Sequence, residues 1–187
     1  KYTPEVKVVS CGQVSNVTGR IYDVKKIWSL LRKDTFFVVD ASQSVPNMPV
    51  DMKEINCDAL IFTAHKMMAY TGLGVLALKH QRVKELQPLS VGGGTIKDVS
   101  CDGFELQSNN EKFEAWTPNI IGAVSLEYAL EYLKTLSPEK TLKSSLQIIS
   151  EHEKKLAEYA LEKFHLLKEQ VKIIGPISED RVALFFF

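Results

Sequence analysis

Short runs of β-branched and aromatic residues alternate with a helix-like segment over the first third of this 187-residue chain. The runs cover residues 6–11, 35–39 and 57–62. Between the first two, apolar residues recur at helical spacing after Asp23, a residue suited to cap a helix. Strands that alternate with helices are typical of parallel sheets. The sequence therefore predicts an α/β fold with a mostly parallel sheet.

Two details of this sheet follow from the same pattern. The helix after Asp23 is expected to run for about three turns on the surface, given the spacing of its apolar residues. The run over 35–39 is continuously apolar, so we expect a strand that is buried on both faces and ends at Asp40. A turn at 72–74 then predicts a further strand over 75–78, and three glycines at 92–94 predict a flexible loop.

The second half of the chain has helical character. Apolar residues at helical spacing after Pro118 and again after Pro138 predict two long amphipathic helices. A break at residues 175–176 separates two last apolar runs, which we expect to be the opening strands of a smaller α+β unit. We thus predict a large-domain segment over 1–136, followed over 137–187 by a connecting helix and the start of a small C-terminal domain.

Composition excludes several classes of protein. Twenty-three Lys and Arg balance twenty-three Asp and Glu, which removes any whole-chain electrostatic case for binding nucleic acid or an anionic membrane. We also expect no membrane span, because no apolar run approaches the roughly 20 residues required. Cys11, Cys57 and Cys101 are widely separated and odd in number, which argues against a disulfide framework and a structural zinc site and favours a reducing compartment. We predict no metal site in this segment. Because apolar runs lie at both ends of the sequence, we also expect it to be part of a longer protein.

Three polar residues lie at or near the predicted strand ends. Asn16, Asp40 and Lys66 should converge at one edge of the sheet if the strands are parallel, and open parallel sheets bind ligands at that edge. A lysine at a buried strand end can become an amine nucleophile that forms a Schiff base. An aspartate that faces a pyridine nitrogen keeps the ring protonated, and this pairing is typical of pyridoxal phosphate (PLP) enzymes. Each residue alone carries little information, so the prediction depends on the ordered combination.

Several motifs extend this combination. They are VSNVTG at 14–19, VDASQS at 39–44, TAHKM at 63–67, TGLGVL at 71–76, GGG at 92–94 and FEAWTPN at 113–119. In order and approximate spacing they resemble the group II, SufS-type cysteine desulfurases of the class V aminotransferase family. The resemblance covers about residues 6–187 and implies the large-domain segment of a PLP-dependent transferase of fold type I.

The resemblance also implies roles for individual residues. Lys66 would form the Schiff base with PLP and later move a proton, Asp40 would pair with the pyridine nitrogen, and Gln43 would pair with the phenolic oxygen. The residues implied to hold the phosphate or to lie beside cofactor and substrate are Thr63, where the family usually has Ser, His65 and Asn16. Thr117 would reach the phosphate of the other subunit, which implies a homodimer with shared sites.

This sequence departs from the family at three further positions. The family usually has His at Gln13, Arg at Lys112 and Gly at Trp116. At Trp116 we expect strained backbone angles and an indole that narrows the cofactor site. At Lys112 we expect any carboxylate contact to be weaker than that of arginine.

The implied activity is conversion of L-cysteine to L-alanine with an enzyme-bound persulfide, which a SufE- or SufU-like acceptor takes up for iron–sulfur cluster assembly. The family's mobile catalytic cysteine and substrate-binding arginine lie beyond the matched part, so we expect this segment alone to be inactive. We expect a cytoplasmic location, or an organellar matrix if a transit peptide precedes the segment. Two alternatives stay open: a selenocysteine lyase or other class V enzyme, and a non-catalytic dimeric scaffold.

Overall fold

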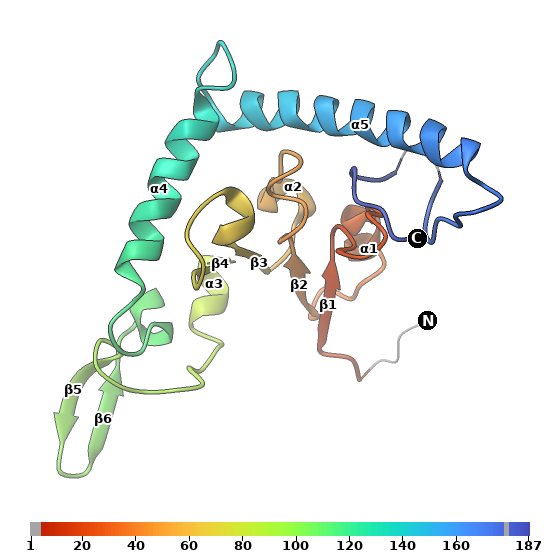
Figure 1. The fold of residues 1–187 in the computed structure, drawn as a ribbon. Coiled ribbons are helices and arrows are strands. Elements are labelled where there is room, and N and C mark those ends of the chain that lie inside the picture. The colour runs from red at the N-terminus through yellow and green to blue at the C-terminus, as the bar shows by residue number, and fades with distance from the viewer. Residues whose placement is uncertain (1–4, 178–179) are drawn as a thin grey trace.

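A four-stranded sheet lies at the centre of the fold (Figure 1). The structure is a computed structural model that describes residues 5–177 and 180–187. The strands follow the chain order in space and are β1 (Val8–Gly12), β2 (Phe36–Asp40), β3 (Ala59–Thr63) and β4 (Gly74–Leu78). The first three are parallel, whereas β4 returns antiparallel beside β3. The predicted mostly parallel α/β sheet is confirmed.

One face of the sheet carries the hydrophobic core. Phe37 and Val39 of β2 are fully buried, together with Val24 of α1 (Val24–Ser29) and Ile55 of α2 (Met52–Ile55). The alternate residues of β2 are only half-buried, so the prediction of burial on both faces holds for one face of the described chain.

The helix α1 is shorter than predicted. It begins where the sequence indicated, because the Asp23 side chain accepts a hydrogen bond from the Lys26 N–H at 3.0 Å. It ends at Ser29, after six residues rather than about three turns. The Ser29 hydroxyl donates to the Lys26 carbonyl at 2.7 Å, and Leu30 N–H bonds to Ile27 at 3.0 Å in a tightened last turn. Both features are typical of helix ends.

Short elements connect the sheet to the helical half of the chain. They are the 3₁₀ helix η1 (Ala64–Met67), α3 (His80–Val83), the hairpin strands β5 (Ile96–Ser100) and β6 (Gly103–Leu106), and the 3₁₀ helix η2 (Asn110–Phe113). The hairpin forms a separate two-stranded antiparallel sheet that projects away from the central one (Figure 1). The three glycines at 92–94 lie in the loop before β5, as predicted.

The two predicted long helices are confirmed as α4 (Ile120–Lys134) and α5 (Leu142–Leu166). Side chains of Asn119 and Thr141 cap their N-termini. Figure 1 shows α5 running past α2 and α1, after which the chain turns back beside α1. Within residues 5–177 and 180–187, no helix combines the length and hydropathy needed to cross a membrane.

The last part of the chain differs from its prediction. The two apolar runs beyond α5 do not form strands; Ile174 and Phe186 pair only as an isolated antiparallel bridge. A second isolated bridge joins Arg20 to Arg181 and so fixes the end of the chain to the loop after β1. A domain boundary between 136 and 137 stays a prediction.

Candidate cofactor site

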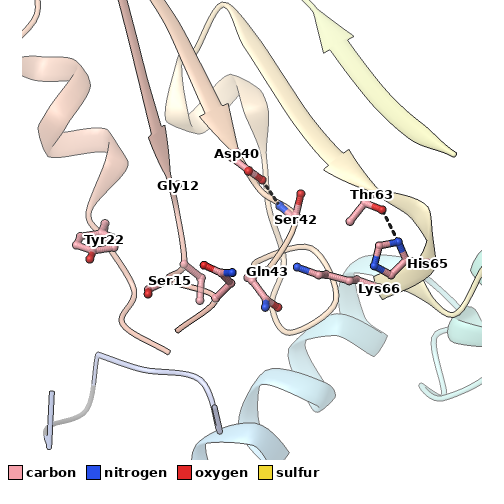
Figure 2. Close-up of a pocket in the computed structure, with 11 residues that line it drawn as sticks. Gly12, Ser15, Tyr22, Asp40, Ser42, Gln43, Thr63, His65 and Lys66 are labelled. Carbon is pink, nitrogen blue, oxygen red and sulfur yellow. Dashed lines mark hydrogen bonds between the residues drawn. The ribbon is translucent and has the colours of Figure 1, made fainter. Parts of the chain in front are cut away.

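A cavity of about 550 Å³ opens at the carboxyl ends of β1, β2 and β3 (Figure 2). The strand register places Gly12 opposite Asp40 and Asp40 opposite Ile61, so the three strands end at one edge of the sheet. The lining residues are Gly12, Val14, Ser15, Asn16, Tyr22, Asp40, Ser42, Gln43, Thr63, His65 and Lys66. The convergence predicted for the strand ends is therefore observed.

The Asp40 carboxylate is held in place at the carboxyl end of β2. Its Oδ1 accepts a hydrogen bond from the Ser42 N–H at 2.8 Å, as drawn in Figure 2. The backbone of Asp40 is fixed as well, since its carbonyl accepts from the Gln13 N–H at 2.9 Å. The following turn is anchored by Ala41, which is fully buried, and it carries Gln43 into the cavity. A carboxylate and an amide thus lie next to each other on one short turn.

Lys66 lies on η1, directly after β3. Buried Ala64 and Met67 anchor this short helix, while Lys66 between them is half-buried and lines the cavity. Figure 2 shows its side chain extending toward Gln43. Among the described residues, the Lys66 amine has no hydrogen-bond or ion-pair partner. The amine is therefore available to a ligand.

Two further polar groups flank this lysine. The Thr63 hydroxyl and the His65 Nδ1 lie 2.7 Å apart and share a hydrogen bond (Figure 2). Thr63 ends β3 and is half-buried, whereas His65 is exposed. A hydroxyl and an imidazole beside an amine form a donor set suited to an anion.

The third wall is the loop after β1, which presents Asn16. Ser15 organises this loop, because its hydroxyl accepts from the N–H groups of Val17 at 3.2 Å and Thr18 at 3.1 Å. The Ser15 N–H in turn donates to the Arg20 carbonyl at 2.8 Å. Asn16 thus protrudes from a closed turn and is solvent-exposed at the cavity.

Thr117 is the one predicted site residue that the structure does not bring to this cavity. It is exposed in the segment between η2 and α4 and is absent from the cavity lining. The resemblance assigns Thr117 to the other subunit's cofactor, and that role stays a prediction.

The sequence analysis missed five lining residues: Gly12, Val14, Ser15, Tyr22 and Ser42. Ser15 and Ser42 sit inside the motifs that carry Asn16 and Asp40, so the strand-end argument extends to them. No local sequence pattern predicted that Tyr22 would line the cavity. An antiparallel bridge between Val14 and Ile21 folds the loop back and brings the tyrosine to the cavity.

Trp116 adopts the conformation expected of the family's glycine. Its φ is 71°, in the left-handed region that disfavours bulky residues. Its N–H donates to the Gly93 carbonyl at 2.8 Å, and its indole covers Gly92, where an added Cβ would lie 2.7 Å from the ring. Trp116 does not line this chain's own cavity. The expectation that its indole narrows a cofactor site concerns the loop that Thr117 would present to the other subunit, and it stays a prediction.

The other two departures are buried supports. The Lys112 amine donates to the Leu86 carbonyl at 2.8 Å and lies 5.0 Å from the Phe113 ring centroid. It thus contacts a carbonyl and an aromatic ring, and no carboxylate contact of the kind expected is seen among the described residues. Gln13 is buried, and its Oε1 has no hydrogen-bond partner in the described part of the chain.

The cysteines behave as two packing residues and one surface thiol. Cys57 is fully buried in the core, and burial raises the pKa of its thiol to about 11. Burial also raises the pKa of Cys11, which packs against the same core. Cys101 is exposed. No cluster of three or more metal-ligating side chains occurs within the described ranges.

Comparison with known proteins identifies the family. The aminotransferase class-V family model matches residues 1–185. Probable cysteine desulfurases from Borreliella burgdorferi and Pyrococcus abyssi are 33% and 36% identical over 99% and 95% of this chain, which covers 43% and 42% of their lengths.

Solved structures give the same result. The cysteine desulfurase of Thermococcus onnurineus NA1, in its apo form, matches with a TM-score of 0.85 and 34% identity over 95% of this chain and 42% of its own. The Escherichia coli cysteine desulfurase CsdA matches with a TM-score of 0.77 and 31% identity over 88% of this chain and 39% of its own. The chain thus spans about two fifths of the relatives' length. It belongs to the aminotransferase class-V family and has the fold of the fold type I, PLP-dependent cysteine desulfurases.

Proposed function

We propose that this chain is the cofactor-binding segment of a PLP-dependent cysteine desulfurase of the group II, SufS type. The parent enzyme converts L-cysteine to L-alanine and an enzyme-bound persulfide, whose sulfur serves iron–sulfur cluster assembly. One observation carries the proposal: a single cavity brings together, at the ends of three strands, an aspartate, an amide and a lysine amine that has no polar partner among the described residues. The names of the relatives and the ordered motifs support the choice of reaction.

The donor set of the cavity fits PLP group by group. The Asp40 carboxylate suits a protonated pyridine nitrogen, and the Gln43 amide suits the phenolic oxygen. The Thr63 and His65 pair suits the phosphate, and the Lys66 amine suits the aldehyde carbon. Every polar group of the cofactor therefore has a matching residue, and Asn16 is left to contact cofactor or substrate.

The residues of this chain have distinct tasks in the proposed reaction. When bound, PLP supplies an electron sink that acidifies the bonds around the substrate α carbon. Asp40 keeps the ring nitrogen protonated, and its carboxylate is already oriented by the Ser42 N–H. Lys66 holds the cofactor and, once released by the substrate amine, moves a proton at the α carbon.

The sulfur-transfer step needs a group outside the set described here. A persulfide forms on a thiolate, whereas Cys57 is buried with a raised pKa and Cys11 packs against the core. Neither lies in the cavity lining, and neither does exposed Cys101. We therefore propose that the segment alone binds PLP without efficient desulfuration of cysteine.

The assembly follows from the same proposal. Thr117 would serve the partner's cofactor in a homodimer, since it is exposed and lies away from its own cavity. A SufE- or SufU-like protein would accept the sulfur. The proposed location is the cytoplasm, or an organellar matrix for a parent with a transit peptide.

Covalent trapping tests the proposal directly. The chain is incubated with PLP, reduced with borohydride to make the lysine–cofactor bond permanent, and mapped by peptide mass spectrometry. We expect the label on Lys66 and its loss in Lys66→Ala, with labelling unchanged in Lys53→Ala, which alters an exposed lysine outside the cavity. Labels scattered over surface lysines of a folded chain would refute the cofactor assignment. In the full-length parent, alanine release from L-cysteine rather than from selenocysteine tests the substrate.

A further inference from the structure

The loop that carries Asn16 is held between the cavity and the end of the chain. Ser15 and Asn16 line the cavity from one side of the loop. From the other side, Val182 N–H donates to the Gly19 carbonyl at 2.9 Å, and the Leu184 carbonyl lies so close that a Cβ on Gly19 would be 2.5 Å from it. Figure 1 shows this last segment of the chain beside β1 and α1. Residues 182 and 184 therefore contact the same loop that forms a wall of the cavity.

Arg181 is the centre of this contact. Its residue is only 4% exposed, and its guanidinium donates to the carbonyls of Thr18 at 3.3 Å, Pro176 at 2.5 Å and Leu184. Its Nε donates to its neighbour's carbonyl at 3.4 Å, and the Phe185 ring centroid lies 3.9 Å from the guanidinium carbon. One planar side chain thus binds the Asn16 loop and two parts of the terminal segment at once.

The chemistry of this site makes the arginine hard to replace. Within residues 5–177 and 180–187 it has no carboxylate partner, so a buried cation is compensated only by neutral carbonyls and one aromatic ring. Burial lowers the pKa of Arg181 accordingly. A lysine carries its three N–H donors on one nitrogen, so it does not reproduce the spread of donors with which the arginine fork reaches carbonyls of both segments.

The terminal segment is also anchored to α5. The Glu153 carboxylate accepts a hydrogen bond from the Ala183 N–H at 3.0 Å. A continuous set of contacts therefore runs from α5 through residues 181–184 and the Thr18 carbonyl to Asn16 at the cavity.

We propose that Arg181 is a positioning residue of the cofactor cavity: by binding the Thr18 and Leu184 carbonyls together, it holds the loop that presents Ser15 and Asn16. Docking of the chain's last segment on this loop then sets the affinity of the cavity for PLP. The ligand part of this inference rests on the proposed function, whereas the ordering of the loop does not.

Two measurements on the same variants test it. PLP affinity is taken from absorbance titration, and loop order from amide hydrogen exchange of peptides that cover residues 15–21. The variant is Arg181→Lys. The matched control is Arg82→Lys, which alters another largely buried arginine. Arg82 lies on α3, outside the cavity, and pairs with Asp58 and Glu85. If Arg181 only stabilised the fold, both variants would unfold more easily, but neither the PLP affinity nor the amide exchange of residues 15–21 would change.

We expect Arg181→Lys to raise the PLP dissociation constant about tenfold, the equivalent of one charge-assisted hydrogen bond, and to speed exchange in the loop. Arg82→Lys should change neither. If Arg181→Lys does not fold, Glu153→Ala removes the acceptor of the Ala183 N–H, loosens the same segment from α5 and should give a smaller change in the same direction. The inference is overturned if Arg181→Lys, or Glu153→Ala in its place, has the same PLP affinity and the same loop exchange as the unsubstituted chain.

Failure of the proposed function has a different signature. A folded, unsubstituted chain that binds no PLP refutes the function and, with it, the claim about affinity. Loop exchange then still decides whether Arg181 orders the residues at the cavity.

Discussion

The contact between Trp116 and Gly92 predicts a strong coupling between two positions that are far apart in the sequence. A Cβ added at Gly92 would lie 2.7 Å from two indole carbons and 2.9 Å from a third. The φ of Gly92 is not in the left-handed region, so alanine is compatible with its backbone. The cost of Gly92→Ala should therefore arise from the indole alone.

The magnitude follows from what the indole loses when it moves away. Trp116 is 68% exposed, so about a third of a surface of roughly 250 Å² is buried, and its exposure to water costs about 2 kcal/mol. This value is an upper limit, because an exposed side chain can rotate into solvent instead of straining the backbone. In a Trp116→Gly background the obstacle is absent, and Gly92→Ala should be neutral or stabilising by about 0.5 kcal/mol.

Thermal unfolding of the four chains measures this coupling. Circular dichroism is the appropriate signal, because Trp116 is one of only two tryptophans and its removal alters fluorescence. For a chain of this size, about 2 kcal/mol corresponds to a midpoint lowered by about 4–8 °C in Gly92→Ala alone. Equal losses from Gly92→Ala in both backgrounds would show that the indole does not cover the glycine as described.

Three further predictions concern the framework around the cavity. Asp58→Asn should lower the free energy of unfolding by about 2–4 kcal/mol in urea at pH 7, because the largely buried Asp58 carboxylate pairs with Arg82 at 3.1 Å. Although burial alone raises the pKa of Asp58, hydrogen bonds from a backbone N–H and Arg82 hold it below its usual value, so this difference should persist above about pH 4 and shrink below it. At pH 8, iodoacetamide should modify Cys101 long before Cys57, whose pKa is about 11; equal rates by mass spectrometry would contradict its burial. Lys112→Met should lower stability by about 1–2 kcal/mol in thermal unfolding, since it leaves a carbonyl without its donor, and an unchanged midpoint would contradict that contact.

The sequence predicted well those parts of the site that depend on local pattern. A continuous apolar run ending at Asp40 and a second strand delivering Lys66 suffice to place both residues at one sheet edge, because parallel strands share their direction. The helix cap at Asp23 was equally local, because a capping side chain acts within its own first turn.

Long-range contacts account for what the sequence did not predict. Tyr22 reaches the cavity only because the loop after β1 folds back on itself, and Arg181 reaches the same loop across most of the length of the chain. The half-buried face of β2 was not predicted for the same reason. A run of apolar residues indicates that both faces of a strand can be buried, but it does not show which other elements pack against each face.

The positions at which this chain departs from its family bear on the scaffold alternative. Gln13, Lys112 and Trp116 all lie outside the lining of the chain's own cavity. Gln13 and Lys112 are buried, and Trp116 packs against a glycine loop next to Thr117, the residue proposed to serve the partner's cofactor. The residues that the resemblance assigns to the chain's own cofactor all line one cavity, and the only change among them, serine to Thr63, keeps the hydroxyl. Among the described residues the Lys66 amine makes no hydrogen bond or ion pair, so drift in a scaffold has no polar contact of Lys66 to preserve. This distribution of changes therefore favours a chain that still binds PLP.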